Sequence, residues 1–211
     1  MADPTFPKRD PADPDFWELR YAAHFAPWDA GKVPARLLSF VEASPPQHVL
    51  VPGCGSAWDV RCFAEHGWDV LGIDFSRLAV EEARRILGAH AQRVREADFF
   101  APLAGAPFDV VYERAFLCAL PRRLWPDWAR RMAQLVRPGG LLAGFFYFDA
   151  GERGPPFPMH GQEELDALLA PAFERIDDQP VDDSIAVFRG KERWQAWRRQ
   201  SGSASKSSDC G

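Results

Sequence analysis

The sequence predicts a doubly wound α/β fold, in which a mostly parallel sheet of seven strands is covered by helices on both faces. Short runs that are apolar throughout alternate with amphipathic segments, which is typical of parallel strands buried beneath helices. Late in the chain two further apolar runs follow each other without a segment long enough to cross between them. An antiparallel hairpin is therefore expected at one edge of the sheet.

The composition indicates one soluble globular domain. The chain has 211 residues, 46% of them hydrophobic and 26% charged, with a net charge of -5. The net charge is negative and the arginines are scattered, so the sequence has no basic patch of the kind that binds nucleic acid. No apolar run is long enough to cross a membrane. We therefore expect a monomer with a small-molecule substrate. The N-terminus lacks the basic start and apolar stretch of a secretory signal, which predicts a cytoplasmic protein.

The four cysteines lie far apart, with no Cys-x-x-Cys pair and no histidine at ligand spacing. This pattern predicts reduced thiols, with neither a disulfide framework nor a metal site.

Two helices are expected before the sheet. Apolar and aromatic residues recur at helical spacing over residues 16–25, and Pro34 opens a second helix that runs through Val41. These helices would form a cap, residues 16–45, on a single domain of residues 16–199.

The two ends of the chain are polar. Residues 1–15 are proline-rich and are expected to be flexible, and the Ser- and Gly-rich residues 200–211 are expected to be a disordered tail.

Strands and helices then alternate along the chain. The first strand ends at Gly53, and the helix over 78–87 has Ala83 and Ile86 on one side with charged residues on the other. A tight turn at 137–140 precedes the fifth strand. The strands are expected at 48–52, 69–73, 94–97, 108–112, 141–148, 173–176 and 184–188. The helices between them are expected at 57–65, 78–87 and 124–136.

Candidate ligand-binding residues directly follow the predicted strands, where ligands bind in doubly wound sheets. Gly53 and Gly55 allow a tight turn and a close approach of the backbone to a ligand. Asp74 is placed to accept hydrogen bonds from a ribose diol, and Asp98 follows the third strand. Together these residues predict an adenosine site.

Each of these residues also has a structural explanation. The glycines fit an ordinary turn, Asp74 fits the N-cap of the next helix, and Asp98 fits a turn cap ahead of a core phenylalanine. A dinucleotide is a competing ligand, but Trp58 stands where the dinucleotide fingerprint has its third glycine beside the pyrophosphate. S-adenosylmethionine has no phosphate and needs only the two glycines, so the pattern favours it.

Several motifs in this order and spacing resemble the thiopurine methyltransferase family, most closely its thiol and halide methyltransferase branch. The resemblance runs from about Phe16 to Arg198. The motifs are Phe16-Trp17-Glu18, Pro27-Trp28-Asp29-Ala30-Gly31, Val51-Pro52-Gly53-Cys54-Gly55, Gly72-Ile73-Asp74, Asp98-Phe99-Phe100, Phe116-Leu117-Cys118-Ala119-Leu120 and Gly154-Pro155-Pro156. The resemblance implies a class I, Rossmann-like methyltransferase that converts S-adenosylmethionine to S-adenosylhomocysteine.

The implied reaction is direct displacement of the methyl group by a soft nucleophile, with no covalent enzyme intermediate. The acceptors that the family suggests are a thiol, thiocyanate, hydrogen sulfide, a halide or a thiopurine. A non-catalytic module that binds S-adenosylmethionine or its product, and a dinucleotide-dependent oxidoreductase, are the alternatives.

The resemblance also implies a cofactor site. Aromatic faces attract a sulfonium cation, although core packing is an alternative role for Trp17. Arg114 contacts the cofactor carboxylate or pairs with Glu113 or Asp98. Plant relatives have an acid and a tyrosine where this chain has Glu113-Arg114, which leaves the acceptor open. The implied cofactor-binding residues are Trp17, Tyr21, Trp28, Gly53, Gly55, Asp74, Phe75, Asp98, Phe99 and Arg114.

Tyr147 and Cys118 are the candidate catalytic residues at the acceptor. Tyr147 ends the fifth strand and would orient the acceptor, while Cys118 would form a polarisable wall or else be a buried core cysteine. Phe146, Phe148 and the proline-rich residues 154–159 would add an apolar lid. His160 is a candidate base, although a histidine in a surface loop is the simpler interpretation.

Overall fold

The computed structural model describes residues 4–201, and its centre is a seven-stranded sheet in the order β3-β2-β1-β4-β5-β7-β6. The strands from β1 to β5 are parallel to their neighbours, while β7 is antiparallel to both β5 and β6. The predicted fold class, including its antiparallel edge, is confirmed. The strands are β1 (His48–Pro52), β2 (Asp69–Asp74), β3 (Val94–Glu96), β4 (Phe108–Arg114), β5 (Val136–Tyr147), β6 (Phe173–Pro180) and β7 (Glu192–Arg199).

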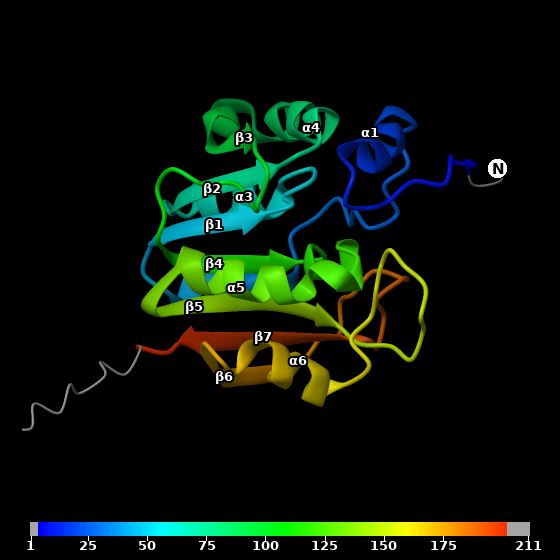
Figure 1. The fold of residues 1–211 in the computed structure, drawn as a ribbon. Helices are drawn as coiled ribbons and strands as arrows, with labels where there is room; N and C mark the ends of the chain where they lie inside the picture. The colour runs from blue at the N-terminus through cyan, green and yellow to red at the C-terminus, as the bar shows by residue number, and fades with distance from the viewer. Residues whose placement is uncertain (1–3, 202–211) are drawn as a thin grey trace, which may run out of the picture.

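Helices cover both faces of the sheet. Figure 1 shows α5 and α6 in front of the sheet, and α1 beyond the arrowheads of the parallel strands. The cap predicted at the N-terminus therefore stands over the carboxyl ends of these strands. The α-helices are α1 (Pro14–Ala22), α2 (Ala35–Ala43), α3 (Trp58–Glu65), α4 (Arg77–Leu87), α5 (Trp125–Leu135) and α6 (Gln162–Leu169). The shorter 3-10 helices are η1 (Gly88–Arg93), η2 (Leu117–Ala119) and η3 (Arg122–Leu124).

The sheet divides the core into two clusters, because successive side chains of a strand point to opposite faces. In β1 the side chains of Val49 and Val51 pack with α2, α3 and α4, while Leu50 packs on the other face with α5 and α6. All three valine and leucine side chains are buried. A run without polar positions is thus explained by helices on both sides.

Residues 4–13, which were expected to be flexible, contact the rest of the domain. The ring of Phe6 lies 5.5 Å from the ring of Phe25, and Asp10 forms an ion pair with Arg123. Asp13 caps α1, which therefore begins at Pro14, two residues earlier than expected. The expected tail over 202–211, with Cys210, lies outside the described residues.

The edge hairpin differs from the prediction in its second strand. That strand is β7, and residues 184–188, predicted to form it, instead belong to the connection after β6. Trp194 and Trp197 of β7 are buried on opposite faces, which makes β7 an inner strand between β5 and β6. The charged residues of β7 interrupt its apolar pattern, so the sequence did not predict a buried strand there.

The predicted turn at 137–140 also differs from the structure. These residues lie inside β5, where the pairing with β4 shifts register between Phe108 and Val110. The shift accommodates the additional residues while the pairing of Val110 with Leu141 continues the ladder.

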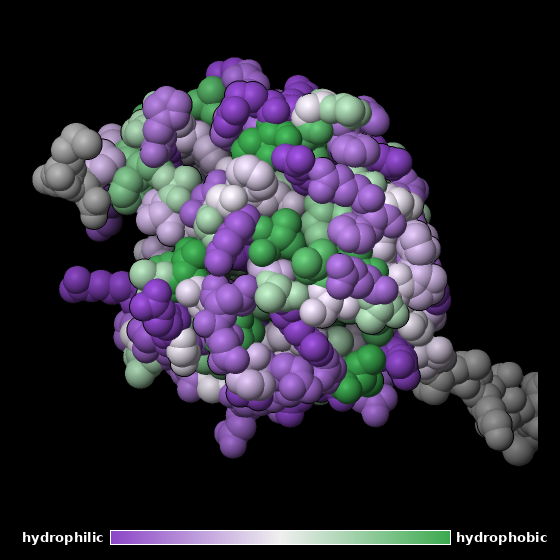
Figure 2. Space-filling model, turned by 180° about the vertical axis from the view of Figure 1, so that it is seen from behind, coloured by the Kyte–Doolittle hydropathy of each residue, from purple (hydrophilic) through white to green (hydrophobic). Residues whose placement is uncertain are grey.

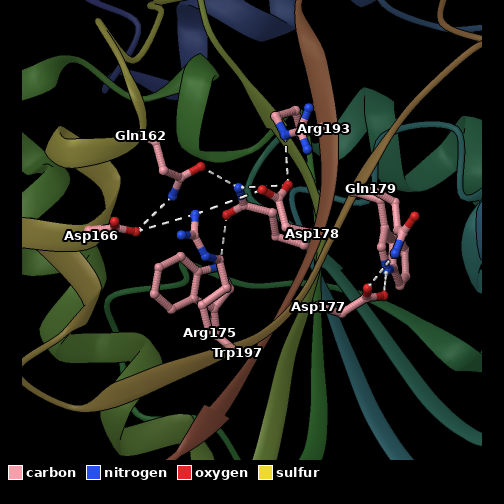
Figure 3. A network of polar contacts seen from close by, with 10 residues as sticks. Gln162, Asp166, Arg175, Asp177, Asp178, Gln179, Arg193 and Trp197 are labelled. Atoms are coloured by element: carbon pink, nitrogen blue, oxygen red, sulfur yellow. Dashed lines mark hydrogen bonds and ion pairs between the residues drawn. The ribbon is translucent and has the colours of Figure 1, made fainter.

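A polar network centred on a buried glutamine joins the antiparallel edge to α6 (Figure 3). Gln195 is fully buried, and its side-chain amide donates to Gln162 and, at 3.3 Å, to Asp178. Its carbonyl accepts from the Trp197 indole at 3.1 Å, and Arg193 donates to Asp178 at 2.6 Å. Because its polar atoms have partners, Gln195 is accommodated in the sheet at little cost.

Figure 2 shows the opposite face of the molecule, where hydrophobic residues form small islands between hydrophilic ones. Across residues 4–201, no helix has both the length and the apolar character needed to cross a membrane.

Candidate functional site

A cavity of about 920 Å³ opens at the carboxyl ends of β1, β2 and β4, beneath the N-terminal cap. β1 and β4 pair with each other although the chain between them forms β2 and β3 on the far side of β1. This is the point at which the strand order reverses, where doubly wound folds bind ligands. All ten predicted cofactor-binding residues line this one cavity: Trp17, Tyr21, Trp28, Gly53, Gly55, Asp74, Phe75, Asp98, Phe99 and Arg114.

The turn after β1 requires its glycines. Gly53 has φ +58°, and a Cβ there would lie 2.4 Å from the ring of Phe116. Gly55 has φ +50°, and its backbone N–H donates to a carboxylate oxygen of Asp74 at 3.0 Å. A left-handed backbone in so close a contact is favourable only for glycine, so the turn positions Asp74 against the cavity.

Asp74 combines a turn-capping role with a place in the cavity wall. Its second oxygen accepts from the backbone N–H of Ser76 at 2.9 Å, while Ser76 itself caps α4. The helix N-cap predicted as an alternative is therefore Ser76, not Asp74. Burial raises the pKa of Asp74 to about 6. Each carboxylate oxygen has a further lone pair, so Asp74 can still accept hydroxyl donors from a ligand.

Three aromatic side chains form one wall of the cavity. The Trp28 ring lies edge-to-face against Trp17 at 5.3 Å and against Tyr21 at 6.1 Å. The Trp17 indole donates to the backbone oxygen of Pro11 at 2.8 Å, which ties the N-terminal segment to this wall. Trp17 lines the cavity and belongs to neither core cluster of the described residues, although its ring also packs against Phe16 at 4.9 Å.

Asp98 and Phe99, which follow β3, line the cavity and also have the structural roles considered for them, a turn cap and a core position. Asp98 is exposed at the cavity and accepts from the backbone N–H of Phe100 at 2.9 Å, as a turn cap does. Phe99 is buried and packs against Phe116 at 5.0 Å while also lining the cavity.

Arg114 forms an ion pair that sequence analysis missed. Its guanidinium lies 3.2 Å from the carboxylate of Asp59 in α3, and pairs with neither Glu113 nor Asp98. Asp59 and Arg114 are far apart in the sequence, so only the fold brings them together. The neighbouring Trp58 indole N–H is buried at the cavity, and it has no hydrogen-bond partner in the part of the chain that the structure describes. Arg114 and Trp58 together offer donors to an anionic group.

The two predicted catalytic residues are placed differently. Cys118 lines the large cavity, and burial raises the pKa of its thiol well above the usual range. Tyr147 does not line the large cavity. Its hydroxyl donates to Asp149 at 3.1 Å, and its ring packs against Phe188 at 5.1 Å, so that Phe188 stands between Tyr147 and the large cavity.

A second cavity of about 10 Å³ lies behind this wall, and both Cys118 and Tyr147 line it. Glu113 also lines it, and its side chain was not predicted as a site residue. Glu113 is 1% exposed, and burial raises its pKa to about 8. An acid inside the apolar run of the fourth strand was the available signal.

The expected lid is divided between the two cavities. Gly154, Pro155 and Pro156 line the large cavity, and the backbone N–H of Phe157 donates to the oxygen of Cys118 at 2.6 Å. The small cavity is lined by Phe146, while Phe148 lines neither cavity. His160 also lines neither cavity; it is exposed, and its ring lies 3.2 Å from the oxygen of Gly151. Val187 and Phe188, from the misassigned strand, complete the large cavity.

The fold is that of class I S-adenosylmethionine-dependent methyltransferases. The 1,6-didemethyltoxoflavin-N1-methyltransferase of Burkholderia thailandensis, solved with S-adenosylhomocysteine, aligns with a TM-score of 0.72 at 20% identity, over 95% of both chains. An N-methyltransferase of Bradyrhizobium japonicum, also solved with S-adenosylhomocysteine, aligns with a TM-score of 0.66 at 17% identity, over 79% of this chain and 85% of that one. The predicted Rossmann-like fold of this class is confirmed.

Within this class, the chain belongs to the thiopurine S-methyltransferase family, whose sequence profile matches residues 12–200. The chain is 33% identical to probable thiol methyltransferase 2 of Arabidopsis thaliana, with 88% of this chain and 85% of the relative covered. It is 30% identical to thiocyanate methyltransferase 1 of Brassica oleracea, with 87% and 84% covered. A thiopurine S-methyltransferase of Vibrio atlanticus is 31% identical, with 75% and 82% covered. The resemblance stated from the motifs is confirmed, and with it the predicted enzyme class and methyl donor.

Proposed function

We propose that the chain transfers the methyl group of S-adenosylmethionine to a small soft nucleophile, a thiol, hydrogen sulfide, thiocyanate, a halide or a thiopurine, by direct displacement. The observation that carries this proposal is the single large cavity, in which the Asp74 carboxylate, an aromatic wall and the Cys118 wall lie around one space. S-adenosylmethionine supplies an electrophilic methyl group on a sulfonium centre. The relatives named for thiol and thiocyanate methylation support this class of acceptor.

The residues of the large cavity fit this cofactor group by group. Asp74 would accept hydrogen bonds from the ribose hydroxyls, and the faces of Trp17 and Trp28 would attract the sulfonium cation. Arg114 and the unpartnered indole N–H of Trp58 would bind the cofactor carboxylate. A buried donor without a partner is costly, so a carboxylate at this position would satisfy Trp58.

The acceptor side of the cavity is apolar. Cys118, Phe188 and Pro155 contribute side chains that hydrogen-bond poorly, so water is excluded where the nucleophile would attack. A raised pKa keeps the Cys118 thiol protonated, so this residue would act as a wall and not as a nucleophile. Most of the rate would then come from holding the acceptor in line with the methyl group.

Methyl transfer from radiolabelled S-adenosylmethionine tests this proposal. The acceptor panel is 2-mercaptoethanol, sodium hydrosulfide, 6-mercaptopurine, potassium thiocyanate and potassium iodide, and turnover is expected with at least one of them. Titration calorimetry with S-adenosylmethionine and with NAD is run beside it. Tight binding of S-adenosylmethionine without turnover on any acceptor would favour a sensing module, while binding of NAD alone would favour an oxidoreductase.

A further inference from the structure

The small cavity lies directly behind the acceptor wall of the large one. Ala115, Cys118 and Phe188 line both cavities, so only the thickness of these side chains separates them. Its volume of about 10 Å³ is close to the space that one water molecule requires. One water molecule in the small cavity would therefore connect a group there with an acceptor at the shared wall, and a proton could pass between them through that water.

The groups that face the small cavity carry no positive charge among the residues described. Its titratable side chains are Glu113 of β4, Cys118 of η2, Tyr147 of β5 and Glu192 of β7, and the remaining lining is apolar. The nearby Arg114 faces the Asp59 carboxylate instead. Two carboxyl groups in apolar surroundings disfavour an anion and accept a neutral hydrogen-bond donor.

Only one of the two carboxyl oxygens of Glu113 takes part in the hydrogen bonds of the fold. One carboxyl oxygen accepts from the backbone N–H groups of Phe116 and Leu117, both at 2.9 Å, and so holds the start of η2. The other oxygen is buried and has no hydrogen-bond partner within the described residues 4–201. An unsatisfied carboxyl oxygen in a protein interior costs about 1–3 kcal/mol, so it needs a compensating function. The unpaired carboxyl oxygen is therefore on Glu113, a residue that lines the small cavity.

We propose that Glu113 accepts the proton of a thiol acceptor, and that the enzyme therefore methylates neutral thiols and hydrogen sulfide in preference to thiocyanate and halide ions. This inference rests on the methyl-transfer function proposed above. The acceptor sulfur forms a bond to the methyl carbon while its S–H bond breaks and the proton moves to the free oxygen of Glu113. The bond from the methyl carbon to the cofactor sulfur breaks with its electron pair on that sulfur, and Glu113 later releases the proton to solvent.

Two of the other titratable groups of the small cavity, Tyr147 and Cys118, are poor proton acceptors. The Tyr147 hydroxyl is engaged with Asp149, and burial raises its pKa to about 12. Burial keeps the Cys118 thiol protonated. Burial raises the pKa of Glu113 to about 8, close to ~8.5 for an unperturbed thiol, and a base of matched strength transfers protons efficiently.

Glu113→Gln is the decisive variant, because its amide oxygen can still accept from Phe116 and Leu117 while the base is removed. With 2-mercaptoethanol, kcat should fall by about 100-fold or more. With iodide, and with 4-nitrothiophenol, which is ionised at neutral pH, kcat should change by less than about threefold because no proton has to be removed. Glu174→Gln is the matched control, since it removes an exposed carboxylate of β6 and should leave all three rates unchanged.

Two further measurements extend the test, the first with a second variant and the second without turnover. Glu113→Asp keeps a carboxylate and should recover part of the activity with 2-mercaptoethanol. Infrared difference spectroscopy of the wild-type protein should show a protonated carboxyl band that titrates near pH 8 and is missing from Glu113→Gln.

The results separate this inference from the proposed function. Equal losses with 2-mercaptoethanol and iodide would assign Glu113 a structural role and overturn the inference, as would an unchanged thiol rate. A wild-type enzyme with higher kcat/KM for iodide or thiocyanate than for 2-mercaptoethanol and hydrosulfide would overturn the acceptor preference. Absence of wild-type turnover on every acceptor would instead contradict the methyl-transfer function itself.

Discussion

The parallel and antiparallel halves of the sheet build the same pair of cavities in different ways. In the parallel half, Gly53, Asp74 and Arg114 lie at the end of a strand or directly after it. In the antiparallel half, Phe188 reaches the cavity from a long connection, while β7 is anchored by the polar network around Gln195. Site residues of the parallel half thus depend on local strand ends, and those of the antiparallel half depend on long-range packing. Substitutions in the two halves should separate ligand affinity from stability.

The largest expected effect is on stability, in the antiparallel half. Trp197 is 2% exposed, packs in the core with α6 and donates to Gln195. Trp197→Ala should lower the free energy of unfolding by about 3–5 kcal/mol, as truncation of a buried tryptophan does. Urea denaturation measures this change. The folded variant should still bind S-adenosylhomocysteine within about twofold of wild type, and a large loss of affinity would break the separation between the two halves.

Asp74→Ala tests the parallel half. Two charge-assisted hydrogen bonds to the ribose would be lost, so the Kd for S-adenosylhomocysteine should rise by about 100-fold in titration calorimetry. Asp69→Ala is the matched control, because Asp69 begins the same strand at its opposite end and is exposed. Equal effects of the two substitutions would show that the loss reflects disruption of β2.

The pH dependence of binding sharpens the role of Asp74. Its pKa of about 6 lies above the usual ~3.9, so the carboxylate is ionised above pH 6 and protonated below it. Because the ionised form accepts the ribose hydroxyls, the Kd for S-adenosylhomocysteine should rise about fivefold between pH 6 and pH 5. Asp74→Ala should flatten this dependence, and an unchanged slope in that variant would assign the titration to another group.

The smallest effect is expected at the aromatic wall. A tryptophan face stabilises a cation by about 1 kcal/mol at a partly exposed site, so Trp17→Ala should weaken S-adenosylmethionine binding about fivefold. S-adenosylhomocysteine is an uncharged thioether and should lose less, while Trp17→Phe should retain most of the preference. Equal losses for both ligands would point to simple loss of contact area.

Most of the parallel half could be predicted from the sequence because its signals are local. A glycine turn after an apolar strand and an acid at the end of the next one stand next to each other in any such sheet, and Gly55 does contact Asp74. The antiparallel edge could not be predicted equally well. Residues 184–188 alternate like a strand but have no partner strand there, while β7 is charged in sequence and buried in the structure.

The acceptor side shows the same limit of sequence analysis. The partner of Arg114 is Asp59, on a different helix, and no spacing rule connects them. Cys118 lines the large cavity, whereas Tyr147 lines only the small one, because the intervening Phe188 comes from the misassigned segment. The roles assigned to both residues stay predictions until the variants are measured.

The position of β7 between β5 and β6 has a consequence for how the chain folds during synthesis. β6 is translated before β7 but pairs only with it, so β6 has nothing to join until residues 192–199 have left the ribosome. Until then the edge of β5 is open, and an unpaired edge with apolar residues such as Phe145 and Phe146 invites pairing with other nascent chains. Completion of the sheet is thus a late event, and slow translation of this last stretch would prolong the aggregation-prone state.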